Sequence, residues 1–366
     1  MSDDFDRDVY CLAGLPIDAV DMSSTLSKLK YAAENHTRCF LSTPNLNFII
    51  ASRYDTEFRN SVIHSDLVVA DGMPLVWMAK MLGIPIRERV AGSSIFEALR
   101  TQDAANPLSI YFFGGQDGVA EIAKREINQT KRGLTCVGYQ SPGFVTVEQM
   151  SAETRIDQIN ASRADFLVVA LGAKKGQSWI LKNLSSIKAP IISHLGAVIN
   201  FGANKLKRAP VFMQNNGLEW LWRIKEEHSL WRRYWHDGLS FLYLLITAVI
   251  PHAFWLLLNQ RYLNKPTKIN SVHLGCAGAT YRITVSGLAL DPISPGLRSI
   301  MRLASLQNAD VVLDLTDAEY LSSGFLGIVL ILKKHLDNHA VKLRVVGIQP
   351  KMERLLKWNG LTDLIR

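Results

Sequence analysis

The chain has 366 residues, of which 48% are hydrophobic and 20% are charged, a composition that suits two or three globular domains and excludes a disordered protein. Its net charge of +8 fits nucleic acid, a membrane surface or an anionic substrate, so the position of the charge must decide. The cysteines form no CxxC pair and have no histidine at metal spacing, which argues against disulfides and a zinc site and favours a location in the reducing cytoplasm. They are Cys11, Cys39, Cys136 and Cys276. The acidic start MSDDFDRDVY predicts no secretory signal.

Apolar runs alternate with amphipathic stretches from residue 10 to about 207, which we assign to a first domain, residues 1–207. The alternation predicts a Rossmann-like parallel α/β sheet with helices on both faces. The runs that read as buried strands are FLSTPN, DLVVADG, LSIYFFGG, TCVGYQS, DFLVVALG and PIISHLGAVINF. Ligands of such sheets bind beyond the carboxyl ends of the strands. We therefore expect a pocket where these runs end in small or polar residues, at 43–47, 71–72, 114–115, 172 and 194–196.

Asp71 follows one of these runs and precedes Gly72. A carboxylate at that place would lie in a partly desolvated cleft, which is the environment that a general base needs. The alternative is that Asp71 caps a helix that begins near Pro74, a common role for Asp before Gly and Pro. These residue types alone leave both interpretations open.

Gly114 and Gly115 separate the run IYFF from the helical stretch GVAEIAKREI. The pair suits a phosphate or a ribose at a helix N-terminus. A tight turn explains it equally well.

The composition changes sharply in the second segment, residues 208–265. Five of the eight tryptophans lie here beside several arginines, and residues 238–258 contain no charged residue. The length of this run suits a membrane span, while tryptophan with arginine is typical of the headgroup interface. Basic residues flank both ends, so the positive-inside rule favours neither orientation. We predict a kinked, monotopic or re-entrant insertion broken at Pro251, with both domains in the cytoplasm at the inner face of the membrane; a buried helical hairpin or an oligomer contact is the alternative.

The α/β alternation restarts in the third segment, residues 267–366, a compact domain of about 100 residues. YRITVSG, ADVVLDLT and VKLRVVGI are strand-like, and SSGFLGIVLILKKHLDNH and PKMERLLKWNGLTDLI are helical. The stretch VVLDLTDAEYLSSGFLGIVLILKKH resembles a STAS domain, the fold of anti-sigma-factor antagonists and of sulfate-transporter tails. Phosphorylated relatives read Asp-Ser-Ser/Thr-Gly at this turn, and Leu321 replaces the Asp here. We favour an N-cap role for Ser322 or Ser323 over phosphorylation, and expect this domain to dock a partner protein or a second copy.

The segment STPNLNFIIASRYDTEFRNSVIHSDLVVADGMPLVWMAKMLGIPIRERVAGSSIFEAL resembles the WecG/TagA/CpsF glycosyltransferases, glycosyltransferase family 26. The family pattern is Thr-x-Asn near the first strand, Asp-Gly after VV, then Arg-Val-x-Gly. Further similarity runs from about Leu12 to Tyr234 and includes FFGGQDGVAEIA, VALGAKKGQSWI, KRAP and GLEWLWRI. The matching residues of the pattern are Thr43, Asn45, Asp71, Gly72, Arg89 and Gly92.

This resemblance implies an inverting transferase that needs no metal and no cofactor. It would move a sugar from a UDP-sugar to a polyprenyl-diphosphate-linked acceptor, with Asp71 as the general base on the acceptor hydroxyl. Thr43 and Asn45 would hold the acceptor sugar or the departing diphosphate nearby. The sequence contains no Asp-x-Asp motif to hold Mg²⁺, so cations and backbone N–H groups would have to bind the leaving UDP. The residues we assign to substrate binding are Arg89, Gly114, Gly115, Gly172, Gln177, Arg208, Arg223 and Arg233.

Arg208, Arg223 and Arg233 lie in the C-terminal appendage. In relatives this appendage closes over the diphosphate at the membrane. A solvated helix face with core tryptophans is the alternative for this segment. The chain also departs from the family: Gly172 to Gln177 reads GAKKGQ where relatives commonly read Gly-x-Pro-Lys-Gln-Glu, and residues 199–201 read INF in place of FDF. The donor sugar is therefore left open.

The sequence thus predicts a membrane-associated glycosyltransferase of surface polysaccharide assembly. The alternative is a catalytically degenerate sugar-nucleotide-binding regulator that signals through the STAS domain. Nucleic-acid binding is disfavoured because the basic residues cluster beside an apolar run instead of forming a groove-sized face.

Overall fold

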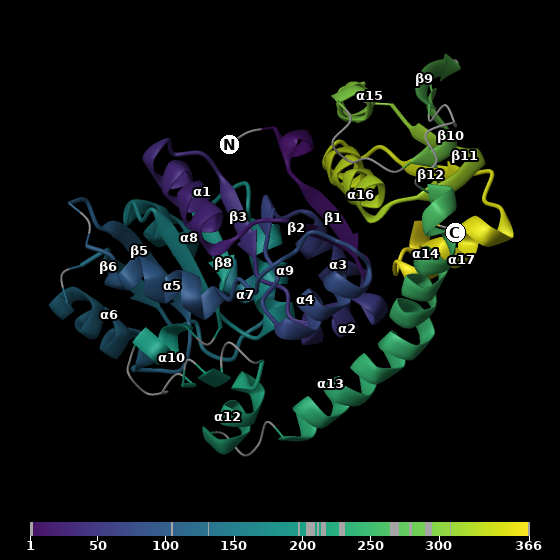
Figure 1. Ribbon diagram of the computed structural model, residues 1–366. Helices are drawn as coiled ribbons and strands as arrows, with labels where there is room; N and C mark the ends of the chain where they lie inside the picture. The colour runs from purple at the N-terminus through teal and green to yellow at the C-terminus, as the bar shows by residue number, and fades with distance from the viewer. Residues whose placement is uncertain are drawn as a thin grey trace.

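The computed structural model describes residues 3–103, 105–130, 132–196, 198–202, 209–210, 212–213, 217–226, 231–263, 271–277, 280–289, 295–307 and 309–364. Its first part is built on a parallel sheet of six strands (Figure 1). Each of the six runs predicted as strands contributes one of them, which confirms the α/β prediction. Across the sheet the order is β4 (Leu67–Val68), β3 (Cys39–Ser42), β8 (Ile191–His194), β7 (Phe166–Ala170), β5 (Leu108–Gly114) and β6 (Leu134–Gln140).

Helices cover both faces of this sheet, which is why its central strands are apolar along their whole length. One face packs against α1 (Met22–Glu34), α5 (Gly92–Thr101), α6 (Val119–Thr130) and α10 (Val198–Gly202). The other face packs against α7 (Val147–Met150), α8 (Glu153–Ala161) and α9 (Ala173–Asn183). A further apolar cluster gathers α2 (Leu46–Tyr54), α3 (Thr56–Ile63) and α4 (Met73–Met81) beside β4.

A β-hairpin that the sequence analysis did not predict precedes the sheet. A short helix, η1 (Asp4–Asp6), leads into β1 (Val9–Leu12), which pairs with β2 (Leu15–Asp18). The two residues of the turn, Ala13 and Gly14, both have positive φ, at 50° and 92°. Two such residues match the right-handed twist of the flanking strands.

The C-terminal part has a mixed sheet of four strands, in the order β12 (Leu343–Val346), β11 (Val311–Leu321), β10 (Thr280–Ala289) and β9 (Ser271–Ala277). Only β9 is antiparallel to its neighbour. Its helices are α15 (Pro295–Ser305), α16 (Ser323–Asn338), α17 (Pro350–Trp358) and η4 (Thr362–Leu364).

The N-terminal hairpin joins the two parts. Phe5, Val9 and Cys11 belong to the same apolar cluster as the residues of α16, so the start of the chain completes the core of its end (Figure 1). Gly327 of α16 allows this approach, because a Cβ there would lie 2.5 Å from the carbonyl oxygen of Val9. This face of α16 is therefore covered by the chain itself.

Residues 231–263 form one long helix, made of α13 (Trp231–Leu244), a π-helical stretch η3 (Leu245–Val249) and α14 (Ile250–Leu263). The predicted break at Pro251 is wrong, and so is the helical hairpin. Proline has no N–H to donate, and the helix absorbs this defect in the wider turn just before it. The long helix changes direction there and connects the two parts of the molecule (Figure 1).

The start of α16 bears out the capping prediction. Ser322 is its N-cap, and its hydroxyl accepts a hydrogen bond from the N–H of Phe325 at 3.0 Å. Leu321 and Ser323 are both buried.

Ser322→Ala should therefore lower the free energy of unfolding by about 1 kcal/mol, measured by urea denaturation. Ser322→Asp should retain most of the wild-type free energy of unfolding. Equal losses for the two variants would contradict the capping role.

Candidate functional site

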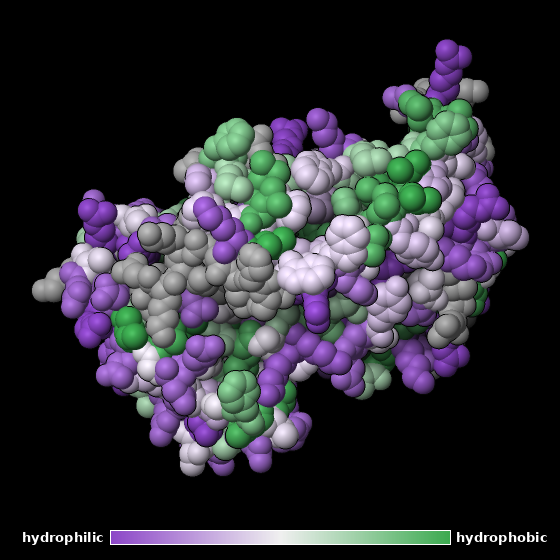
Figure 2. All heavy atoms as spheres, turned by 90° about the horizontal axis from the view of Figure 1, so that it is seen from below, coloured by the Kyte–Doolittle hydropathy of each residue, from purple (hydrophilic) through white to green (hydrophobic). Residues whose placement is uncertain are grey.

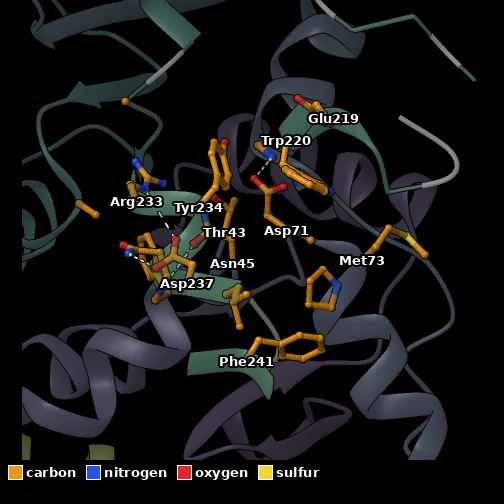
Figure 3. Close-up of a pocket in the computed structure, with 18 of the residues that line it drawn as sticks. Thr43, Asn45, Asp71, Met73, Glu219, Trp220, Arg233, Tyr234, Asp237 and Phe241 are labelled. Carbon is orange, nitrogen blue, oxygen red and sulfur yellow. Dashed lines mark hydrogen bonds and ion pairs between the residues drawn. The ribbon is translucent and has the colours of Figure 1, made fainter. Parts of the chain in front are cut away.

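A cavity of about 950 Å³ lies at the carboxyl edge of the six-stranded sheet. Four adjacent strands lead into it: Thr43 follows β3, Asp71 follows β4, Gly172 follows β7, and His194 ends β8. The opposite wall comes from α12 (Glu219–Glu226) and α13. In Figure 3 Asp71 points into this cavity, with Glu219 and Trp220 of α12 and Tyr234, Asp237 and Phe241 of α13 around it. The structure thus brings the predicted edge of the sheet and part of the basic, aromatic segment together in one site.

Helices α2, α4, α5 and α9 begin where the sheet edge borders this cavity. Asn45 is the N-cap of α2, Gly72 of α4 and Gly172 of α9, and Gly92 is the first residue of α5. Of these, only α2 is capped by the side chain of its own N-cap residue, in which the Asn45 side-chain oxygen accepts from the N–H of Phe48 at 3.2 Å. Helix N-termini attract anions, because their first N–H groups have no partner within the helix. The site is therefore suited to a ligand with phosphate groups.

Asp71 does not cap α4. That helix begins after Gly72 without any side-chain hydrogen bond at its N-cap, so the helix-cap interpretation is wrong. One carboxylate oxygen of Asp71 accepts from the N–H of Gly92 at 3.2 Å, and the other lies 3.4 Å from Nη2 of Arg89. The side chain is 23% exposed and faces the cavity, so a substrate hydroxyl can reach it.

Arg89 links Asp71 to a second carboxylate, Glu219, which lies 2.6 Å from the guanidinium. Burial disfavours the charge on Arg89, but the charges of Asp71 and Glu219 outweigh this and raise its pKa. The guanidinium therefore stays protonated and ties α12 to the base of the site. The sequence analysis missed Glu219, because the only signal was one acid in the aromatic stretch GLEWLWRI.

Thr43 is buried at the floor of the cavity. A Cβ on Gly92 would lie 3.2 Å from its hydroxyl oxygen and 2.5 Å from the side chain of Leu195. A side chain at position 92 would thus displace the floor of the site. The glycine allows α5 to present its first N–H to Asp71 at this close range.

A third carboxylate, Asp237 of α13, lines the cavity and is buried. It accepts a hydrogen bond from the side-chain amide of Asn47 at 3.3 Å, and its other oxygen lies 3.8 Å from Nε of Arg233. Arg233 thus reaches the cavity (Figure 3). Of the other two predicted arginines, Arg223 belongs to α12, and Arg208 lies outside the described residues.

Among the predicted binding residues whose side chains the structure describes, three do not line the cavity: Gly114, Gly115 and Gln177. Both glycines have positive φ and pack closely, since a Cβ on Gly114 would lie 2.6 Å from the carbonyl oxygen of Ala170 and one on Gly115 would lie 2.9 Å from Ile199. Gln177 is fully buried and donates to the hydroxyl of Ser42 at 2.8 Å. Each therefore has a packing role, and Gln177 supports the residue that precedes Thr43.

His194 was predicted only as part of a strand end. Its Nε2 lies 2.6 Å from the carbonyl oxygen of Leu171, and a Cβ on Gly176 would lie 2.3 Å from its ring. Burial lowers its pKa, so it is neutral at pH 7. Gly176 thus makes room for an imidazole in the wall of the cavity.

The comparison with protein families gives two matches. The glycosyl transferase WecG/TagA/CpsF family matches residues 10–253, and the STAS domain matches residues 293–366.

The similar curated proteins are named N-acetylglucosaminyldiphosphoundecaprenol N-acetyl-beta-D-mannosaminyltransferases. The protein from Bacillus spizizenii is 25% identical over 239 residues, which cover 64% of this chain and 89% of the relative. One from Staphylococcus aureus strain MW2 is 20% identical over 224 residues, covering 61% and 85%. Another, from Staphylococcus aureus strain NCTC 8325, is 20% identical over 214 residues, covering 58% and 82%.

Proposed function

The chain belongs to the WecG/TagA/CpsF family of glycosyltransferases and carries a STAS domain, and from this premise we propose that it transfers a sugar from a UDP-sugar to a polyprenyl-diphosphate-linked acceptor. The transfer would invert the anomeric centre, need no metal, and serve the assembly of a surface polysaccharide such as an exopolysaccharide, a capsule or a teichoic acid. The names of the relatives support this class of acceptor. The observation that carries the proposal is the place of Asp71, a half-buried carboxylate in a cavity where α2, α4, α5 and α9 begin.

Asp71 is the general base of this proposal. In a single displacement the acceptor hydroxyl attacks the anomeric carbon while the bond to UDP breaks, and the hydroxyl proton passes to the carboxylate of Asp71. The N–H of Gly92 donates to that carboxylate at 3.2 Å and the guanidinium of Arg89 lies 3.4 Å from it, so both orient it in the cavity. Thr43 and Asn45 lie at the adjacent strand end, where they hold the acceptor sugar or the diphosphate.

The leaving UDP needs positive charge where its second negative charge develops. The uncapped N-termini of α4 and α9 provide N–H groups at the cavity, Gly172 leaves space beside one of them, and Arg89 and Arg233 provide cations. By resemblance we add Arg208 and Arg223. Gly114, Gly115 and Gln177 act as supports of these strand ends.

The long helix gives the proposed enzyme its membrane contact. By length and composition alone it could cross a bilayer. Trp235, Leu239, Leu242, Ile246, Ile250, Phe254 and Leu257, spaced three or four residues apart, are exposed and form what we call the apolar face. Seen from below, hydrophobic side chains gather on the side of the molecule that carries this helix (Figure 2).

We propose that the apolar face lies in the headgroup region of the inner leaflet, with both domains cytoplasmic. Because Trp235 and Leu239 also line the cavity, a lipid-linked acceptor would enter from the membrane.

The direct test is mass spectrometry of the products from a panel of UDP-sugars with a polyprenyl-diphosphate-GlcNAc acceptor. One donor should give a product heavier by one sugar residue. Tight UDP-sugar binding without any product would favour the regulator instead.

Activity should survive EDTA. Among the described residues no three His, Cys, Asp or Glu side chains are grouped as metal ligands, and the cations above are placed to bind the diphosphate. Turnover would be measured after EDTA dialysis and after adding Mg²⁺ or Mn²⁺. A saturable requirement for either ion would contradict the arginine and helix N-terminus account.

A further inference from the structure

Five charged side chains meet where the STAS domain touches the transferase domain, and we call them the ion cluster: Asp4, Arg7, Asp18, Asp66 and Lys334. Lys334 comes from α16 of the STAS domain, and its side chain is only 3% exposed. Its ammonium group lies 2.7 Å from the carboxylate of Asp66 and 2.8 Å from that of Asp4. Arg7 and Asp18 form a second buried pair at 2.7 Å.

The ion cluster anchors the amino ends of β3 and β4. Asp66 accepts from the N–H of Phe40 in β3 at 3.0 Å, and Asp18 accepts from the N–H of Val68 in β4 at 2.7 Å. The carbonyl oxygen of Ser65 accepts from both Arg7, at 3.0 Å, and Lys334, at 3.2 Å. These two strands end in the site, since β3 leads to Thr43 and β4 leads to Asp71.

Anchoring matters most for β4. This strand has two residues, lies at the edge of the sheet, and pairs only with β3, through Leu67 and Val68. Its ladder is short, and backbone hydrogen bonds continue beyond it: the N–H groups of Asp66, Val69 and Asp71 donate to carbonyl oxygens of the β3 segment, and the carbonyl oxygen of Ala70 accepts from Val90. The side chains of the ion cluster add to these bonds by holding Asp66 and Val68, at the start of the backbone that carries Asp71.

We propose that Lys334 of the STAS domain is a positioning residue of the transferase reaction, which holds the strand that places Asp71. The proposal rests on the function proposed above, in which Asp71 is the base. It makes turnover depend on the docking of the STAS domain, so a partner that displaces α16 would switch the enzyme off.

The charge balance supports this role. The three carboxylates and two cations give the ion cluster a formal charge of −1. Losing Lys334 would leave Asp66 with the N–H of Phe40 and, as its nearest cation, with Arg38, 3.4 Å away and 54% exposed. An uncompensated buried carboxylate is unfavourable, so Asp66 would move toward solvent and draw the start of β4 with it. Small shifts of this kind have large effects, because a misplacement of about 1 Å can cost a reaction on the order of 100-fold.

The test compares Lys334→Met with Lys334→Arg and with Lys333→Met, a matched control on the same helix whose lysine pairs only with Asp337 among its described contacts. We expect Lys334→Met to lower kcat by about 10- to 100-fold, with KM for the donor unchanged within about 2-fold. Lys334→Arg should restore most of the turnover, and Lys333→Met should match the wild type. Equal turnover of the Met variants at positions 333 and 334 would overturn the proposal.

A second variant covers a failure of Lys334→Met to fold. Lys334→Met combined with Asp4→Asn keeps the formal charge of the ion cluster at −1 but still removes the contact with Asp66. It should fold, as judged by its thermal unfolding, and still lose turnover; wild-type turnover would overturn the proposal.

A double-mutant cycle separates this proposal from the proposed function. In an Asp71→Asn background, Lys334→Met should change the residual turnover by less than about 2-fold, because it acts through Asp71. If Lys334→Met lowers the turnover of the Asp71→Asn variant by the same factor as it lowers that of the wild type, Lys334 does not act through Asp71. If Asp71→Asn alone is nearly as active as the wild type, the assignment of Asp71 as the base has failed, whatever the variants at position 334 do; if no UDP-sugar gives a product with the wild type, the proposed function has failed.

Discussion

Asp71→Asn should lower turnover by at least about 100-fold, the usual scale of general base catalysis, with little change in UDP affinity. The amide keeps the shape of the side chain and can still accept from the N–H of Gly92, but it cannot take a proton from the acceptor. Turnover would be measured with the donor found in the product assay, and UDP affinity by calorimetry.

Two other carboxylates line the same cavity and serve as matched controls. Asp237→Asn keeps an oxygen to accept from Asn47, and Glu219→Gln keeps one to accept from Arg89. We expect each to keep turnover within about 10-fold of the wild type, because neither takes the proton in the proposed reaction. A loss centred on Glu219 with an active Asp71→Asn variant would move the base to α12.

The strands of both sheets were largely predictable, and the reason lies in their burial. DFLVVALG and LSIYFFGG are apolar without interruption because helices cover both sides. The hairpin of β1 and β2 escaped prediction because VYCLAGLPID has no polar alternation and its turn is Ala-Gly, not the usual Asn-Gly. Val9 and Cys11 are buried against α16, more than 300 residues later in the chain, and the local sequence pattern carries no trace of such a contact.

Part of the site could also be predicted from the sequence, and part could not. Thr43, Asp71 and Gly172 could be predicted to meet, since parallel strands bring their carboxyl ends to one edge. Gln177 is one turn into α9, and only the structure shows that it points at Ser42 instead of the cavity. Glu219 enters the site because α12 folds back over the sheet edge, and Lys334 reaches Asp66 because the domains dock. Neither of these two contacts can be predicted from the hydrophobic periodicity of the sequence.

The long helix shows a further limit of sequence. An uncharged run suggests lipid on all sides, yet Leu244, Ala248 and Val249 pack in the apolar cluster beside α4. Trp255 stacks on Tyr320 of the STAS domain at 5.3 Å. Cutting the chain within this helix would therefore expose transferase core and remove Lys334, so the membrane contact is better tested by substitutions on the exposed side.

Leu242→Asp, Ile246→Asp and Leu257→Asp together should release the protein from membranes, because all three side chains belong to the apolar face and point away from the core. Burial of each is worth at least about 1.5 kcal/mol, and about 1.4 kcal/mol is tenfold, so partitioning should fall on the order of 1000-fold. Flotation with vesicles of phosphatidylethanolamine and phosphatidylglycerol would measure it.

The control is Phe144→Asp, which changes a fully exposed apolar side chain far along the chain from this helix; this variant should float like the wild type. Turnover of the triple variant on a water-soluble acceptor should stay within about 3-fold, since the face contributes no catalytic group, while turnover on vesicle-borne acceptor should fall with partitioning. If the triple variant still floats, the apolar face is not the membrane contact. If instead the wild type sediments as a dimer and the triple variant as a monomer, a second copy covers the face, and the acceptor must reach Asp71 by another path.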